Sequence, residues 1–133
     1  MTDHLFVYGT FCRGFCRHKI LRRLGAKSAG QGSIPAELFD LGEYPGAIRS
    51  PRGSARVVGE LYPLPDAERA FKVLDAVEGF QANAPEHALF KRETVGVTLA
   101  NKRRAIAWVH WLNHVPSPRR RIASGDYVTA GHD

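Results

Sequence analysis

The sequence is poor in the features that mark secreted and membrane-bound proteins. It has only two cysteines among its 133 residues. No apolar run approaches the roughly 20 residues that a membrane-spanning helix needs. The first residues, Met1 to His4, do not form the basic stretch and apolar segment of a secretory leader. We therefore expect a single globular domain over residues 1–133, located in the cytoplasm and not attached to a membrane.

Signals for metals and cofactors are equally scarce. Cys12 and Cys16 are so close in sequence that a disulfide would close a very small loop, and we expect two reduced thiols. His18 is the one nearby residue that could add a metal ligand, and the other histidines lack metal-site spacing. The sequence has no glycine-rich phosphate loop, no dinucleotide fingerprint and no nucleophile elbow. We expect no metal, no cofactor and no covalent nucleophile supplied by the protein.

The charge of the chain is unbalanced, with a formal net charge of +6. Basic clusters of this kind suggest either nucleic-acid binding or solvated faces that attract small anionic molecules. Aromatic residues do not interleave with the basic stretches as base-stacking platforms would, so nucleic acid is the less favoured partner. The oligomeric state is left open. The basic residues gather in three stretches: Arg13, Arg17, Lys19, Arg22, Arg23 and Lys27; Lys102, Arg103 and Arg104; and Arg119, Arg120 and Arg121.

Strand patterns outnumber helical ones along the chain. Helices are predicted over 17–24 and 66–77, the second with Asp66 as its N-cap. Pro35 should mark an edge or the start of an extended segment, and Glu43 to Gly46 should form a turn. This mixture predicts an α+β fold, a small mixed β-barrel flanked by short helices. The expected strands or extended segments cover 4–8, 34–41, 54–62, 89–99 and 103–112.

The N-terminal segment predicts a strand that ends at a candidate binding loop. Leu5 to Tyr8 have high strand propensity, and Gly9 and Thr10 follow directly. Because Gly9 has no Cβ, another molecule can approach the main chain closely, and loop N–H groups can reach a ligand. The alternative is an ordinary first strand that ends in a turn. Tyr8, Gly9, Thr10 and Phe11 are therefore candidate binding residues.

Two glutamates stand out from the other acidic residues. Glu78 extends the apolar stripe of Phe71 and Leu74 on the second predicted helix. An ionised carboxylate there is costly, so its pKa should rise toward the range that a general acid/base needs. The alternative is a helix-terminal glutamate whose side chain turns to water. Glu60 shares one face of a predicted strand with Tyr62, where it faces either a cavity or solvent.

Eight short motifs occur in one order along nearly the whole chain, and together they resemble the γ-glutamylcyclotransferase-like family. The resemblance is to the branch that contains AIG2-like proteins and γ-glutamylamine cyclotransferase. In order, the motifs are Val7-Tyr8-Gly9-Thr10-Phe11, Arg13-Gly14, Tyr44-Pro45-Gly46, Val58-Gly59-Glu60-Leu61-Tyr62, Leu74-Asp75-Ala76-Val77-Glu78-Gly79, Phe90-Lys91-Arg92, Ala107-Trp108-Val109 and Ile122-Ala123-Ser124-Gly125-Asp126-Tyr127.

The resemblance implies both an activity and roles for residues. Members of the family cyclise a γ-glutamyl group: the α-amine of the substrate attacks its own γ-carbonyl, which releases 5-oxoproline and a free amine. Glu78 matches the catalytic glutamate and would move the protons as general acid/base. Main-chain N–H groups of the loop would bind the α-carboxylate or the oxyanion. The implied substrate-binding residues are Tyr8, Gly9, Thr10, Phe11, Tyr44 and Tyr62, although the tyrosines could equally belong to the core.

Departures from the family pattern bear on the substrate more than on the fold. Phe11 replaces the usual leucine, and Phe90 replaces the common tyrosine, which removes a hydroxyl. The loop over 80–88 also differs from the short family connection. We expect a γ-glutamylamine or a γ-glutamyl-protected small molecule as substrate, with the leaving amine undetermined. Two other hypotheses are a non-catalytic small-molecule-binding domain and a basic nucleic-acid-associated domain.

Overall fold

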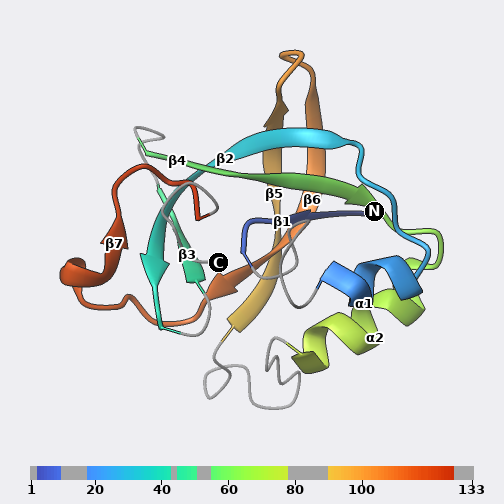
Figure 1. Cartoon of the computed structure of the whole chain (residues 1–133), viewed down its shortest axis with the longest axis horizontal. Helices are drawn as coiled ribbons and strands as arrows, with labels where there is room; N and C mark the ends of the chain where they lie inside the picture. The colour runs from blue at the N-terminus through green and yellow to red at the C-terminus, as the bar shows by residue number, and fades with distance from the viewer. Residues whose placement is uncertain (1–2, 10–17, 43–44, 51–54, 78–89, 128–133) are drawn as a thin grey trace.

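The computed structural model describes residues 3–9, 18–42, 45–50, 55–77 and 90–127, with only the backbone given for 75–77. The centre of the structure is a barrel built from β1 (His4–Val7), β2 (Gly30–Asp40), β4 (Arg56–Pro63), β5 (Phe90–Leu99) and β6 (Arg104–Leu112). These strands neighbour one another in the order β2-β4-β1-β6-β5 (Figure 1). β1 runs parallel to β6, and the other neighbouring strands are antiparallel. Pairing of Gly32 with Leu99 and of Ser33 with Thr98 joins β2 to β5 and closes the barrel.

Strand β2 changes partners halfway along its length. From Gly30 to Pro35 it pairs with β4, and from Ala36 it pairs with β3 (Pro45–Arg49). β7 (Arg121–Ile122) also pairs with this second half. The expectation that Pro35 marks an edge or a start was wrong, because β2 begins at Gly30 and continues past the proline. Pro35 has no N–H to donate, so it fits the point where one ladder ends and the next begins.

Strand β3 occupies a segment whose beginning the sequence assigned to a turn. Pro45 is the first residue of this strand, a position that tolerates the missing N–H. Gly46 packs directly against the side chain of Leu112, and a Cβ there would lie 2.5 Å from the leucine Cδ1. The two residues that suggested a turn therefore begin a strand that packs closely on β6. Glu43 and Tyr44 lie outside the described residues.

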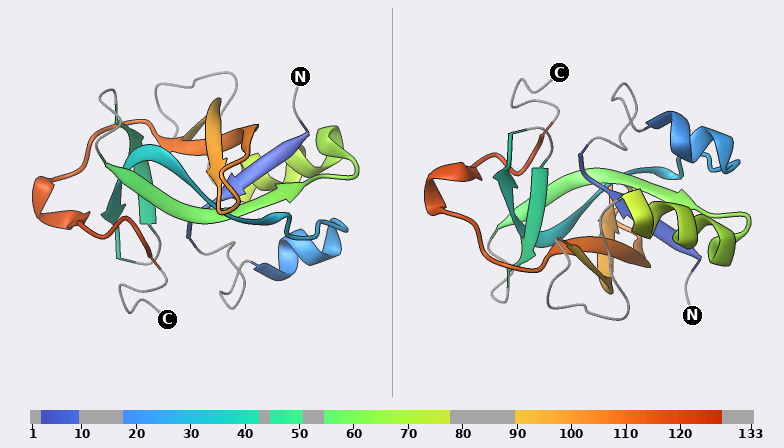
Figure 2. Two further views of the ribbon diagram at one scale, coloured as in Figure 1. Left: turned by 90° about the horizontal axis from the view of Figure 1, so that it is seen from above. Right: turned by 90° about the horizontal axis from the view of Figure 1, so that it is seen from below.

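Two short helices lie at one end of the barrel, whereas β3 and β7 lie at the other (Figure 2). They are α1 (His18–Arg23) and α2 (Ala67–Val77). Asp66 caps α2 as predicted, since its Oδ1 accepts the N–H of Arg69 at 3.2 Å. Within the described part of the chain, neither helix is long and apolar enough to cross a bilayer. The predicted α+β class, a small mixed barrel flanked by short helices, is confirmed.

Most of the described buried apolar residues form one cluster inside the barrel and another beneath the helices, and Phe39, Phe90 and Leu112 form a small third one. β1 contributes to the first two, because alternate side chains of a strand point to opposite faces. Phe6 and Tyr8 enter the barrel interior, whereas Leu5 and Val7 pack beneath the helices. We call the second group the helix-side cluster; it contains Leu5, Val7, Leu21, Ala26, Tyr62, Leu64, Ala70, Phe71 and Leu74.

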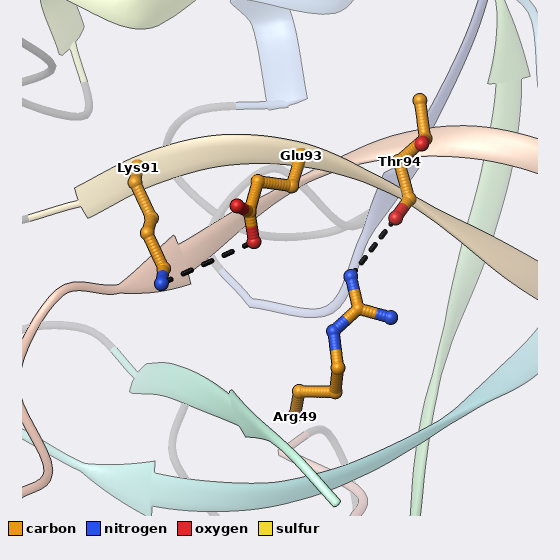
Figure 3. A network of polar contacts seen from close by, with 4 residues as sticks. All are labelled: Arg49, Lys91, Glu93 and Thr94. Atoms are coloured by element: carbon orange, nitrogen blue, oxygen red, sulfur yellow. Dashed lines mark hydrogen bonds and ion pairs between the residues drawn. The ribbon is translucent and has the colours of Figure 1, made fainter. Parts of the chain in front are cut away.

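A polar link joins β3 to β5 where β2 has turned away from the barrel. The Arg49 guanidinium donates to the carbonyl oxygen of Thr94 at 2.9 Å (Figure 3). The same guanidinium lies 4.9 Å from the ring centroid of Trp111. Beside it, Lys91 and Glu93 form an exposed ion pair at 4.0 Å (Figure 3). Arg49 thus attaches β3, and with it the sheet that β3 forms with the second half of β2, to the barrel. The ion pair stays in solvent and adds little to stability.

Gly59 offers a test of how tightly β1 and β4 approach each other. A Cβ at this position would overlap the carbonyl oxygen of Val7 and lie 2.7 Å from the Phe6 ring. Gly59→Ala is therefore expected to lower the free energy of unfolding by about 1–3 kcal/mol in urea denaturation. Gly96→Ala is the matched control, because no atom lies within 4 Å of the added methyl group. Equal stability of the two variants would contradict the close approach.

Candidate active site

The end of β1 holds Tyr8 between two other strands. The Tyr8 hydroxyl donates to the carbonyl oxygen of His110 at 2.6 Å and accepts the N–H of Ala47 at 3.2 Å. Its ring is buried in the barrel interior, with 7% of the residue exposed. The hydroxyl therefore links β1 to β6 and to β3. Of the two roles open to Tyr8 in the sequence, the described contacts are those of a core residue.

Gly9 lies against Pro45. A Cβ on Gly9 would fall 2.8 Å from the Cδ of Pro45 and closer still to its Cγ. The space that the glycine leaves open is therefore filled by a residue of the same chain, in another of the eight motifs. Two motifs separated by about 35 residues of sequence meet here, as the residue numbers show. The main chain at Gly9 is therefore supported from this side by Pro45, the first residue of β3.

Polar residues from three strands share one level of the sheet on its helix-covered face. Glu60 pairs with Val7, and Arg92 pairs with His110. Leu5 is registered with Trp108 across the parallel ladder, so Val7, two residues on, lies beside His110. Residues opposite one another on neighbouring strands share a face. The order across this level is therefore Glu60, Val7, His110 and Arg92, next to the point where β1 runs into Tyr8 and Gly9.

Glu60 is held by a tyrosine on its own strand. The Tyr62 hydroxyl donates to Oε1 of Glu60 at 3.2 Å. Tyr62 is 1% exposed within the helix-side cluster, and its ring centroid lies 6.0 Å from that of His18 at the start of α1. The predicted alternation of Glu60 and Tyr62 on one strand face is thus present. Of the two expectations for Tyr62, the described contacts are those of a core residue, and its part in substrate binding stays a prediction.

Arg92 packs against two neighbouring aromatic rings on the same face. Its guanidinium carbon lies 4.1 Å from the Phe71 ring centroid and 4.6 Å from that of Trp108. The two rings meet edge to face at 5.9 Å. Cation–π contacts of this kind attract the guanidinium to the two rings and favour this one position of the Arg92 side chain. Arg92 and the buried His110 were not singled out as site residues from the sequence, because only the sheet register brings them beside the end of β1.

The remaining predicted site residues lie outside the described part of the chain. They are Thr10, Phe11, Tyr44 and Glu78, and the loop over 80–88 is likewise not described. Phe90, where the family has tyrosine, is 2% exposed and packs with Phe39 and Leu112. Its ring therefore belongs to a small apolar cluster.

The described basic residues do not gather on one face. Arg22, Arg23 and Lys27 are exposed on or after α1, while Lys102, Arg103 and Arg104 are exposed at the tip of the β5–β6 hairpin. A third exposed group, Arg119 to Arg121, lies at the 3-10 helix and β7. Figure 1 shows these elements at three separate corners of the molecule. This distribution fits solvated surfaces better than a continuous track for a polyanion.

The comparisons with known proteins agree with this architecture. The model of the family described as "Gamma-glutamyl cyclotransferase, AIG2-like" matches residues 5–129. The fold is similar to that of an AIG2-like protein from mouse, with a TM-score of 0.76 and 23% identity over 98% of this chain and 90% of the other. YkqA from Bacillus subtilis gives a TM-score of 0.72 and 25% identity over 96% of this chain. The chain spans 40% of YkqA.

A protein from Pyrococcus horikoshii is also similar, with a TM-score of 0.66 and 20% identity over 99% of this chain and 100% of the other. No curated protein sequence matches the chain. Because the family model covers nearly its whole length, the chain belongs to the AIG2-like γ-glutamyl cyclotransferase family. The family resemblance predicted from the eight motifs is confirmed.

Removal of the Tyr8 hydroxyl tests its role in linking β1 to β6 and β3. Tyr8→Phe would leave the His110 carbonyl and the Ala47 N–H without this partner inside the barrel. We expect the free energy of unfolding to fall by about 1–3 kcal/mol. Tyr62→Phe is the matched comparison: it loses a bond at a partly buried site that water can replace, so its loss should be about 0.5–1.5 kcal/mol. Chemical denaturation followed by circular dichroism measures both, and a smaller loss for Tyr8→Phe would refute the assignment.

Proposed function

We propose that this protein catalyses γ-glutamyl cyclotransfer. It converts the γ-glutamyl amide of a small amine, or a γ-glutamyl-protected small molecule, into 5-oxoproline and the free amine. One observation carries the proposal: Val7 and Leu74 pack in the same helix-side cluster. Tyr8 and Gly9 follow Val7 directly in the sequence, and Glu78 follows Leu74 by four residues.

The reaction suits a protein with no nucleophile of its own. The α-nitrogen of the substrate forms a bond to the γ-carbonyl carbon, and the bond from that carbon to the leaving nitrogen breaks. The α-ammonium gives up two protons, and the leaving nitrogen takes up two to depart as an ammonium. Amide replaces amide, so the exchange is balanced without an added reactant. Holding the chain in a ring-forming conformation provides an entropic advantage.

Glu78 is the residue that we assign to proton transfer. A free α-amine has a pKa near 8, so at neutral pH it must lose a proton before or during attack. In this proposal the Glu78 carboxylate takes up that proton as a general base. The same carboxyl group can then protonate the leaving nitrogen. Such transfer contributes roughly 100- to 10,000-fold to the rate.

The loop after β1 supplies the polar contacts in this proposal. Main-chain N–H groups of Gly9, Thr10 and Phe11 bind the α-carboxylate or the developing oxyanion. Pro45 packs against Gly9, and the Tyr8 hydroxyl accepts the N–H of Ala47, so the two residues before Thr10 are held from the barrel side. Tyr44 and Tyr62 complete the lining.

A substrate panel tests the activity directly. The protein is incubated with γ-glutamyl amines and γ-glutamyl dipeptides, and 5-oxoproline is measured. Release from at least one compound is expected. A protein that folds normally and releases 5-oxoproline from none of them would contradict cyclotransfer. Binding of a panel member without turnover would instead support the non-catalytic binding hypothesis.

Glu78→Gln tests the assigned residue. We expect kcat to fall at least about 100-fold, because the amide cannot exchange protons with the substrate. Glu68→Gln is the control, since Glu68 lies exposed on the first turn of α2 and its loss should leave kcat within about twofold. Full activity of Glu78→Gln would remove Glu78 from its role and leave cyclisation itself standing.

A further inference from the structure

The ladder of hydrogen bonds around the barrel is interrupted between β2 and β5. It ends where Ser33 lies opposite Thr98. Continuing the same register would place Pro35 opposite Gly96, but Pro35 has no N–H to donate. Its carbonyl oxygen instead accepts the N–H of Ser50, the residue after β3, at 3.0 Å. From this point β2 therefore continues with β3 as its partner, and β5 is left behind.

The edge of β5 that faces β3 has no neighbouring strand among the described residues beyond this point. The Thr94 carbonyl accepts a bond from the Arg49 side chain on β3, so the main-chain polar groups of Thr94 point away from β6. Those of Gly96, two residues further on, point the same way, and both residues are exposed. We call this interrupted stretch of wall, between Arg49 on β3 and Thr94 and Gly96 on β5, the seam.

The Arg49 side chain crosses the seam. It reaches from β3 to the carbonyl oxygen of Thr94 at 2.9 Å (Figure 3). Its guanidinium also lies 4.9 Å from the ring centroid of Trp111. Arg49 is exposed and Trp111 is 1% exposed, so the guanidinium covers the indole on its solvent side. Closure of the seam over this indole therefore depends on the contacts of a long, exposed side chain.

The indole beneath Arg49 carries a hydrogen-bond donor that the protein does not satisfy. Nε1 of Trp111 is buried, and no acceptor in the described part of the chain lies within hydrogen-bond distance of it. Buried donors without a partner are rare, because burial removes their bonds to water and supplies nothing in return. The closed seam thus keeps a polar group from water at a cost in free energy.

Opening of the seam has two opposing effects on the free energy. Release of Arg49 gives up one hydrogen bond and one cation–π contact, which are weak at an exposed position because water competes for the guanidinium. Access of water to Nε1 recovers what burial of the donor cost. Opening should therefore cost less here than where a strand is bonded on both sides.

We propose that the seam is a gate in the barrel wall, which Arg49 holds closed over Trp111 and which opens to admit water to Nε1. The gate does not depend on the proposed catalytic activity.

Hydrogen exchange of the wild-type protein, followed by NMR, tests the gate without any substitution. The protection factor of the Trp111 indole N–H should be at least about 10-fold below that of the Val95 amide, which lies on β5 and bonds to β6. Equal protection of the two groups would mean that water reaches Nε1 only when β5 separates from β6. That result would overturn the proposal.

Arg49→Ala removes the side chain that closes the gate. Exchange at the Trp111 indole should accelerate about 5- to 30-fold, while exchange at the Trp108 indole should stay within about twofold. Arg49→Lys should give an intermediate rate, because an ammonium lacks the planar fork of the guanidinium. Arg104→Ala is the matched control: it removes the same charge from an exposed position on β6 and should change neither indole.

Two results with these variants would overturn the proposal. Unchanged exchange of Trp111 in Arg49→Ala would show that the arginine does not hold the gate. Equal acceleration of both indoles would indicate a general loss of stability and no local opening. If Arg49→Ala misfolds by circular dichroism, the wild-type comparison of Trp111 with Val95 decides.

Discussion

The placement of one short strand governs the rest of the structure. β1 has four residues, yet it lies between β4 and β6 and divides its side chains between the barrel interior and the helix-side cluster. This placement requires a close approach to β4, which only a glycine at position 59 allows, because Val7 and Phe6 occupy the space of a side chain there. Without that contact, the end of β1 would have no fixed position.

Several residues of the family motifs lie where distant segments of the barrel contact one another. Gly9 meets Pro45, Gly46 meets Leu112, and Gly125 lies directly against the backbone of Arg56. Each contact joins segments that are distant in sequence, and each requires a residue without Cβ. The motifs therefore specify the shape of the barrel around the loop as much as its chemistry. If mutation of these glycines reduced activity, the first explanation would be a change in the barrel structure.

The sequence was sufficient for the helices, for most strands and for the fold class, because hydrophobic periodicity and the Asp66 cap are local signals. It was insufficient where tertiary contacts decide. Pro45 and Gly46 have the composition of a turn, but packing against β6 makes them a strand. Pro35 resembles a boundary, whereas it lies where β2 exchanges partners. The site was predicted in part: Glu60 and Tyr62 were placed on one face, whereas the level shared with His110 and Arg92 depends on the parallel register between β1 and β6.

The charged groups on the helix-covered face explain why so apolar a cluster borders a proposed site for a polar substrate. The Arg92 guanidinium lies over the rings of Phe71 and Trp108, and Glu60 accepts a hydrogen bond from Tyr62, so each charged group contacts an aromatic side chain on this face. Aromatic packing fixes these groups more firmly than exposed ion pairs would, because exposed pairs are screened and mobile. A substrate that supplies its own nucleophile needs orientation above all. Charged groups held in place beside the end of β1 can provide this orientation.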